Sequence, residues 1–346
     1  MYPNMIGYVV AVALAAMAVT VLARGGGEET KSPATFPVGH STSHELIDVE
    51  KRAEAPLLAA GGGLVTIIRE AYPNITTCSV KIFDPSTGDA TVLVDDVSTV
   101  CQDRSSANSR ASSAWLPPTA VTELHKNGVL DSQPSAAGLL LVTTGSGKYV
   151  WGINVATGAL SKVAALPAGL DVVSIGYDAS TLKIFVLSTD ALYLVANGDV
   201  TKVYSGISLN SITAAVAWSG TGSLYAADAS GHLLTLDLVN YRLYSTALSI
   251  SVLNLDWLGA NNTLVALASY ELYDVDPVDG SLSKLWKVPD GNGYPATHTV
   301  NDFVYYVADF QNLYTVSLFD YSILDKVAFD GYFTVGGIHY VAASTS

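Results

Sequence analysis

Positive charge is scarce in this sequence. It has 17 Lys and Arg residues against 31 Asp and Glu, which gives a formal net charge of −14 at pH 7. A protein that binds nucleic acid needs clustered Lys and Arg to displace the counterions of the phosphate backbone. The deficit therefore argues against a nucleic-acid partner.

Charged residues of both signs make up only 14% of the 346 residues, whereas 49% are hydrophobic. Disordered chains, coiled coils and collagen-like rods have compositions far from this one. A chain of this length can bury the core of one large domain or of two small ones.

Glutamate is rare after residue 52, where the acidic residues are 22 Asp and 4 Glu. Glu favours helices, whereas Asp favours turns and caps. The bias predicts many tight turns and an all-β fold.

The N-terminus has no charged residue before Arg24, and residues 5–23 are almost entirely apolar. Such a run is typical of a secretory signal peptide, so we expect residues 1–23 to be a signal and the protein to be secreted and extracellular. The run is also nearly long enough to span a membrane. A retained anchor is therefore the alternative, and we expect contact with a membrane only in that case.

Residues 24–52 are polar and aperiodic, as expected of a linker or pro-segment. They end in Lys51 and Arg52, a dibasic pair that resembles the kexin-type processing sites of fungal secreted proproteins. Any surface Lys-Arg pair would look the same. We expect cleavage after Arg52 and a mature domain of residues 53–346.

Cysteine is limited to Cys78 and Cys101. An even number in an oxidising compartment predicts a disulfide, with two buried thiols as the alternative. The sequons at Asn74 and Asn261 lie in turn-like contexts, and they predict a glycoprotein.

From about residue 130 the chain repeats itself, with aligned anchor residues at Tyr177, Trp218, Trp257, Val300 and Val335. Their spacings are 41, 39, 43 and 35 residues. Each unit reads as four short strands joined by Gly, Asn and Asp turns. Four strands per period of about forty residues indicate a β-propeller blade.

The outer hairpins of the blades can be counted, and there are six of them, at residues 79–96, 149–166, 191–204, 232–247, 271–287 and 312–327. Residues 332–343 read as an inner pair without an outer pair, so we expect the C-terminal strands to complete the first blade and close the ring. Residues 56–70 could form a further inner pair, which makes seven blades the alternative. Residues 97–129 fit no strand pattern and predict a long loop over one face.

Some of these strings resemble a known superfamily. Residues 224–228 (LYAAD) and 305–309 (YYVAD) resemble the inner hairpins of NHL-type and gluconolactonase/strictosidine-synthase-like propellers, and residues 83–88 (FDPSTG) resemble their outer turn. The resemblance implies a propeller over most of residues 64–343. It does not choose between enzymes and non-enzymes, because these strings encode blade geometry.

Gluconolactonase-like enzymes hold a divalent cation in the central channel with Glu, Asn and Asp side chains. Asn254, Asp256 and Asp171 fall where inner strands line that channel, and they could offer oxygens to Ca²⁺. The sequence has no Glu at the start of an inner strand, which argues against a lactonase. Alternatively, Asp256 is a hydrogen-bonded polar residue inside the ring.

Two other groups of residues resemble metal-binding sites. His298, His339 and His232 could form a zinc site if they converged, although a single His on a strand is usually a packing residue. Residues 274–280 (DVDPVDG) look like a calcium loop, but they lack the EF-hand spacing and read as an outer turn.

The sequence thus predicts a secreted binding propeller for an extracellular protein, peptide or glycan. The alternative is a metal-dependent hydrolase or lactonase that acts on a small extracellular molecule. No catalytic residue can be named, so the sequence leaves open whether the protein is an enzyme.

Overall fold

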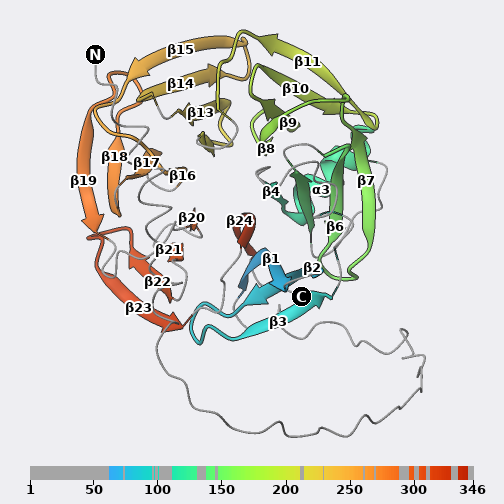
Figure 1. Cartoon of the computed structure of the whole chain (residues 1–346), viewed down its shortest axis with the longest axis horizontal. Helices are drawn as coiled ribbons and strands as arrows, with labels where there is room; N and C mark the ends of the chain where they lie inside the picture. The colour runs from blue at the N-terminus through green and yellow to red at the C-terminus, as the bar shows by residue number, and fades with distance from the viewer. Residues whose placement is uncertain are drawn as a thin grey trace, which may run out of the picture. The chain divides into compact units, whose positions relative to one another are not determined.

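Each repeat folds into a four-stranded antiparallel blade, and six blades form a ring in the computed structural model, with two neighbouring blades joined into one eight-stranded sheet (Figure 1). The structure describes residues 62–72, 75–95, 97, 100, 111–130, 138–144, 147–210, 214–228, 230–259, 262–268, 270–287, 296–299, 304–308, 312–328 and 334–341. The protein is therefore a six-bladed β-propeller, as predicted, and the seven-bladed alternative is wrong.

We number the blades in chain order and give their strands from the channel outward. Blade 1 consists of β24 (Thr334–Val341), β1 (Gly63–Tyr72), β2 (Ile75–Phe83) and β3 (Ala90–Val94). Blade 2 consists of β4 (Ala111–Leu116), β5 (Leu139–Thr144), β6 (Tyr149–Asn154) and β7 (Leu160–Ala165). Blade 3 consists of β8 (Val172–Asp178), β9 (Lys183–Ser188), β10 (Ala191–Ala196) and β11 (Asp199–Ser205).

In the other three blades, the four strands follow one another in chain order from the channel outward. Blade 4 consists of β12 (Ala215–Trp218), β13 (Ser223–Ala227), β14 (His232–Asp237) and β15 (Arg242–Ala247). Blade 5 consists of β16 (Asn254–Leu258), β17 (Thr263–Ala268), β18 (Glu271–Val275) and β19 (Leu282–Lys287). Blade 6 consists of β20 (Ala296–Thr299), β21 (Val304–Ala308), β22 (Asn312–Ser317) and β23 (Ile323–Ala328).

The last strand closes the ring. β24 pairs antiparallel with β1, from Gly63 opposite Val341 to Ile68 opposite Thr334. The C-terminus thus completes the first blade, as predicted. The details differ, because β24 is one strand rather than an inner pair, and residues 63–72 are likewise the single strand β1.

The predicted loop at residues 97–129 is wrong in part. It contains β4 and a helix, α3 (Pro118–Lys126), which links the first and second strands of blade 2. The β4 sequence ASSAWL has no β-branched residue, so the composition that usually indicates a strand is missing. Pro118 starts the helix, and Ala120, Val121 and Leu124 bury its inner face.

Buried apolar side chains fill every junction between neighbouring blades. The described core falls into six clusters, one for each of the six blade-to-blade interfaces. At two interfaces an inner-strand Trp stacks on an aromatic ring of the preceding blade. The ring centroids of Phe185 and Trp218 are 6.2 Å apart, and those of Tyr225 and Trp257 are 5.3 Å apart.

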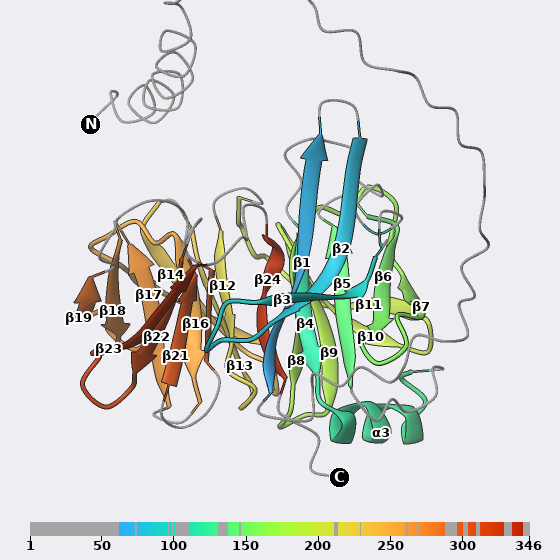
Figure 2. The same cartoon turned by 90° about the horizontal axis from the view of Figure 1, so that it is seen from below.

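The two faces of the ring carry different connections. We call the face with the turns between the first and second and between the third and fourth strands the turn face. Since α3 joins the first two strands of blade 2, it lies on this face, and Figure 2 shows it opposite the projecting β1–β2 hairpin.

The chain divides into residues 1–51 and residues 52–346, and all described residues belong to the second part. In the described part of the chain, no helix has both the length and the hydropathy needed to cross a membrane. The apolar segment at residues 5–23 lies outside the described residues.

Glycines in the outer turns allow one blade to approach the next. Gly280 has φ +75°, and a Cβ placed on it would overlap the Ala247 carbonyl oxygen of blade 4. Gly169 has a similar φ of +77° but no atom within 4 Å of such a Cβ. Any other residue would therefore be strained at both positions, but only at Gly280 would its Cβ also overlap a neighbouring blade.

We therefore expect Gly280→Ala to destabilise the protein more than Gly169→Ala. Left-handed backbone costs each variant about 1–2 kcal/mol, and the overlap should cost Gly280→Ala a further 1–3 kcal/mol or so. Chemical denaturation of both variants measures the difference. Equal losses would show that the outer turn does not pack as described.

Candidate binding surface

The residues predicted to bind calcium lie in two blades that are not neighbours. Asp171 is exposed and directly precedes β8 in blade 3, whereas Asn254 and Asp256 lie on β16 in blade 5. The Oδ1 of Asp256 accepts a 2.8 Å hydrogen bond from the Trp257 N–H. Among the described residues, no group of three or more His, Cys, Asp or Glu could hold a metal. Asn254 is not one of these residue types, so the Ca²⁺ site remains a prediction.

The predicted histidine site is not formed by the described side chains. His339 lies on β24, and its Nε2 is 2.7 Å from the Oγ of Ser113 on β4. His232 is exposed on β14 of blade 4, where its Nδ1 is 2.9 Å from the Ser230 hydroxyl. His298 lies on β20, but its side chain is outside the described residues.

The Ser113–His339 pair couples a hydroxyl to an imidazole, as a nucleophile and a base would be coupled. Ser113 is only 8% exposed, and both residues lie where blade 1 meets blade 2. A nucleophile has to reach its substrate. The pair is therefore best explained as a polar contact that joins the two blades near the ring closure.

Several sequence predictions concern residues that the structure does not describe. Cys78 is buried on β2, but Cys101 lies outside the described residues, so the disulfide remains a prediction. The same holds for glycosylation and processing, whose residues Asn74, Asn261, Lys51 and Arg52 are also outside them.

The outer turns follow one design in five blades. The first turn residue accepts a hydrogen bond from the backbone N–H of the third residue, which fixes the turn. These acceptors are Asp84, Asn154, Asp237, Asp276 and Ser317. The fifth residue has positive φ and is Gly88, Gly158, Tyr241, Gly280 or Tyr321.

The third residue of each turn faces solvent, and its character differs around the ring. Blades 1 and 2 have Ser86 and Ala156 at this position. Blades 4, 5 and 6 have Val239, Val278 and Phe319, which are 62%, 85% and 96% exposed. We call these three side chains the apolar tips. They lie on the turn face of three consecutive blades.

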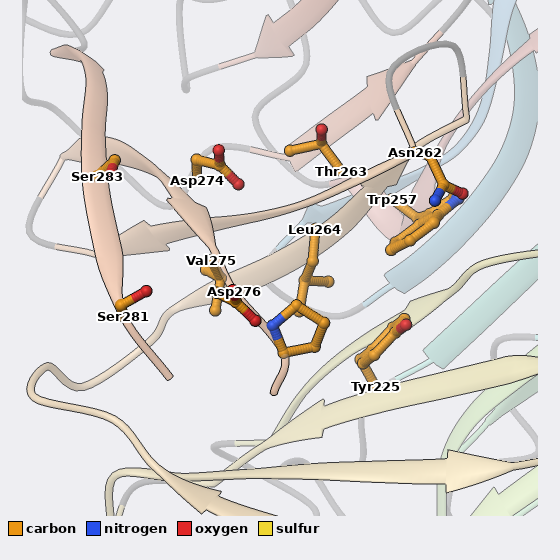
Figure 3. A pocket seen from close by; sticks show the side chains of 11 residues that line it. Tyr225, Trp257, Asn262, Thr263, Leu264, Asp274, Val275, Asp276, Ser281 and Ser283 are labelled. Carbon is orange, nitrogen blue, oxygen red and sulfur yellow. The ribbon is translucent and has the colours of Figure 1, made fainter. Parts of the chain in front are cut away.

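An open pocket of about 520 Å³ lies on the turn face at the end of blade 5 (Figure 3). The β16–β17 and β18–β19 turns border it, and the second of these turns also carries Val278. It is lined by Tyr225, Trp257, Asn262, Thr263, Leu264, Asp274, Val275, Asp276, Pro277, Ser281 and Ser283.

The aromatic end of the pocket is closely packed. The rings of Tyr225 and Trp257 are inclined by only 12°, and the two residues are 6% and 9% exposed. Burial raises the pKa of the Tyr225 hydroxyl, whereas its hydrogen bond with Ser223 lowers it. The pair thus forms a fixed apolar wall, reinforced by the contact between blades 4 and 5.

Asp274 is the unusual residue of the pocket. Burial raises the pKa of its carboxyl above the ordinary value, the negative charge of Asp276 raises it further, and a hydrogen bond with the Val275 backbone lowers it. Two positions before the outer turn, the corresponding residues in four other blades are Ile82, Gly152, Thr235 and Thr315. Blade geometry therefore does not require a carboxylate here.

The sequence analysis predicted an outer turn at residues 274–280 and missed the pocket. The turn is confirmed at residues 276–280, whereas Asp274 and Val275 belong to β18. The signal that could have revealed the pocket is Asp274, which is charged at a position where the aligned repeats have neutral residues. Its proximity to the Tyr225–Trp257 pair depends on how blades 4 and 5 meet, which strand pattern alone does not specify.

Several solved structures have the same propeller fold as this chain. One chain from a nidogen–laminin complex matches with a TM-score of 0.57 and 10% identity, over 82% of this chain and 99% of that one. A Bacteroides caccae protein of unknown function gives a TM-score of 0.51 and 10% identity, with the same coverage. At such identities the likeness establishes the propeller fold alone. No protein-family model and no curated protein matches the sequence.

The raised pKa of Asp274 predicts the effect of removing its charge. A carboxyl whose pKa is raised by folding destabilises the folded state at neutral pH, and this cost vanishes as pH falls through the raised pKa to the unfolded value. We expect Asp274→Asn to raise the melting temperature at pH 7 and to have little effect near pH 3. Thermal melts across this range measure the difference.

Asp279→Asn is the matched control. Hydrogen bonds from the backbone N–H and side chain of Ser281 lower the pKa of the Asp279 carboxyl, so its charge favours the folded state. This variant should not gain stability at pH 7. A gain of equal size in both variants would contradict the explanation for Asp274.

Proposed function

We propose that the chain is a secreted β-propeller that binds a protein partner through the turn face of blades 4, 5 and 6. The observation that carries the proposal is the row of apolar tips Val239, Val278 and Phe319. A single exposed apolar residue is common on protein surfaces and needs no explanation. Three exposed apolar residues at the same turn position in consecutive blades, however, are a repeated feature that calls for an explanation.

The fold itself does not account for the apolar tips. The turn is fixed by its first and fifth residues, and the third position accepts Ser86 or Ala156 in other blades. An exposed phenyl ring gains no packing energy within the chain. Burial against a partner would remove its apolar surface from water, which is the main driving force of protein association.

The charge around the tips indicates the chemistry of the partner. Asp237 and Asp276 cap their turns, while Asp279 and Asp320 lie beside Val278 and Phe319. Apolar centres surrounded by acidic groups favour a partner with an apolar centre and a basic rim. One chain of a nidogen–laminin complex has this fold, and that complex is a precedent for a propeller bound to another protein.

The N-terminal sequence supports secretion. The apolar run at residues 5–23, the polar segment after it and the Lys51-Arg52 pair follow the order of a secreted proprotein. The two sequons and the even number of cysteines agree with an extracellular location.

Site-specific cross-linking tests the binding face. A benzophenone amino acid placed at position 278 or 319 should capture a protein partner, because these side chains would contact it. The same probe at position 86 or 156 occupies the same turn position in blades 1 and 2 and should capture none. Mass spectrometry of the adducts identifies the partner for binding measurements.

Val278→Ser and Phe319→Ser should then each weaken the binding of that partner about tenfold or more, because a buried apolar side chain contributes about 1.5–3 kcal/mol. Both variants should keep the melting temperature of the parent protein. Equal capture at all four positions, or adducts only between two copies of this chain, would overturn the proposal.

N-terminal sequencing of material from a eukaryotic secretory host tests the leader separately. We expect the protein in the medium to begin at Ala53. Lys51→Ala/Arg52→Ala should be secreted with a start near residue 24. A wild-type chain retained in the membrane fraction would instead establish residues 5–23 as an anchor.

A further inference from the structure

We propose that the pocket at the end of blade 5 binds a neutral saccharide of one or two rings. This site is distinct from the apolar tips, and the inference does not depend on a protein partner. The volume of about 520 Å³ falls within the range of small-molecule pockets, roughly 300–1,000 Å³.

The charge of the lining selects against anions. None of the lining residues is Lys, Arg or His, whereas two are Asp. A phosphate, sulfate or carboxylate ligand would meet repulsion from Asp274 and Asp276 without a compensating cation. Phosphorylated and acidic ligands are therefore excluded from this pocket.

The polar end of the pocket is arranged for hydroxyl groups. Asp274 lies opposite Ser283 in the β18–β19 register and opposite Val265 in the β17–β18 register. Thr263, two residues before Val265, faces the same side of the sheet. A sugar hydroxyl can donate to the carboxylate, while Ser and Thr hydroxyls can both donate and accept.

The other end is apolar and closely packed, and only a small part of each side chain is accessible to a ligand, since Tyr225, Trp257, Leu264 and Val275 are 6%, 9%, 1% and 1% exposed. Trp257, Leu264 and Val275 belong to the opposite side of the blade, in one cluster with Tyr225 of blade 4. The lining thus includes residues from both sides of the blade, together with Asn262 of one turn and Asp276 of the other, which Figure 3 labels. A pyranose has an apolar C–H surface and a rim of hydroxyls, so a short saccharide matches both ends.

The hydroxyls, the amide and the aromatic wall also distinguish this pocket from a cation site. In the described part of the chain, no third acidic, His or Cys side chain joins Asp274 and Asp276 to form a metal group. A bare cation would use the carboxylates and leave the aromatic wall and most hydroxyls without a role. A neutral polyol uses all three.

Asp274 is a carboxylate at a position where four other blades carry neutral residues. A residue that breaks the local pattern without a structural gain is expected at a functional site. A hydrogen bond to a charged acceptor contributes more than one to a neutral acceptor. The carboxylate is thus the residue on which saccharide affinity should depend most.

Calorimetric titration of the full chain with maltose, cellobiose, laminaribiose, chitobiose and mannobiose tests the proposal. We expect at least one of these disaccharides to bind with one-to-one stoichiometry. Asp274→Asn should weaken that binding about tenfold or more. Ser283→Ala should weaken it by a smaller factor, and it serves as a second variant if Asp274→Asn does not fold.

Two matched controls separate this site from its surroundings. Asp279→Asn removes a carboxylate from the same turn but outside the pocket lining, and it should bind the disaccharide as the wild type does. Val278→Ser/Phe319→Ser should also leave saccharide binding unchanged. Loss of partner capture and loss of saccharide binding are therefore independent results.

Three outcomes would overturn the inference. The first is that no disaccharide of the panel binds to the wild-type chain. The second is unchanged affinity in both Asp274→Asn and Ser283→Ala. The third is that hexa-arginine binds, loses its binding in Asp274→Asn and competes with no disaccharide, which would make the pocket a site for basic peptides.

Discussion

The pairing of β24 with β1 is the contact on which the rest of the ring depends. It joins Gly63 to Val341 and supplies the inner strand of blade 1 from the far end of the domain. Until it forms, blade 1 lacks its inner strand, and the core cluster that blade 1 shares with blade 2 lacks Val341. The pairing is also among the most non-local contacts in the chain, so its loop-closure entropy has to be offset by the packing that it completes. We infer that the ring folds and unfolds with its two ends tied together.

Closure also imposes the same demands on every blade, which makes departures from the repeat informative. Each outer turn needs a first residue that caps the chain and a fifth residue that accepts positive φ. Gly280 meets the second demand and leaves room for the Ala247 carbonyl of blade 4. The third turn residue meets neither demand and is free to vary. The change from Ser86 and Ala156 to Val278 and Phe319 is therefore not required by the turn itself.

The fold could be predicted from the sequence because the repeat encodes it. Alternating strands with Asp, Asn and Gly turns specify the blade, and the anchors Trp218 and Trp257 occupy the positions where blades stack. The pattern failed at β4, since Ser112 and Ser113 meet polar side chains, Ser174 and His339, rather than an apolar layer. The pocket could not be predicted, because it combines residues from blades 4 and 5 whose meeting depends on side-chain packing. The calcium residues Asp171 and Asp256 were predicted because inner strands line the central channel, whereas the pocket lies at the end of a blade.

The two halves of the ring differ in the demands placed on them. Blades 1 and 2 carry the closing strand β24, the helix α3 and the Ser113–His339 contact, so much of their sequence serves the integrity of the ring. The strands of blades 4, 5 and 6 each follow in simple chain order, and blade 6 packs against blade 1 through Tyr306 and Leu313. Their turn face is free to carry groups that cost stability or gain nothing from folding, such as the carboxylate of Asp274 and the side chain of Phe319. The exposed groups of these turns lie outside the β24–β1 pairing, so changes in them leave that pairing intact.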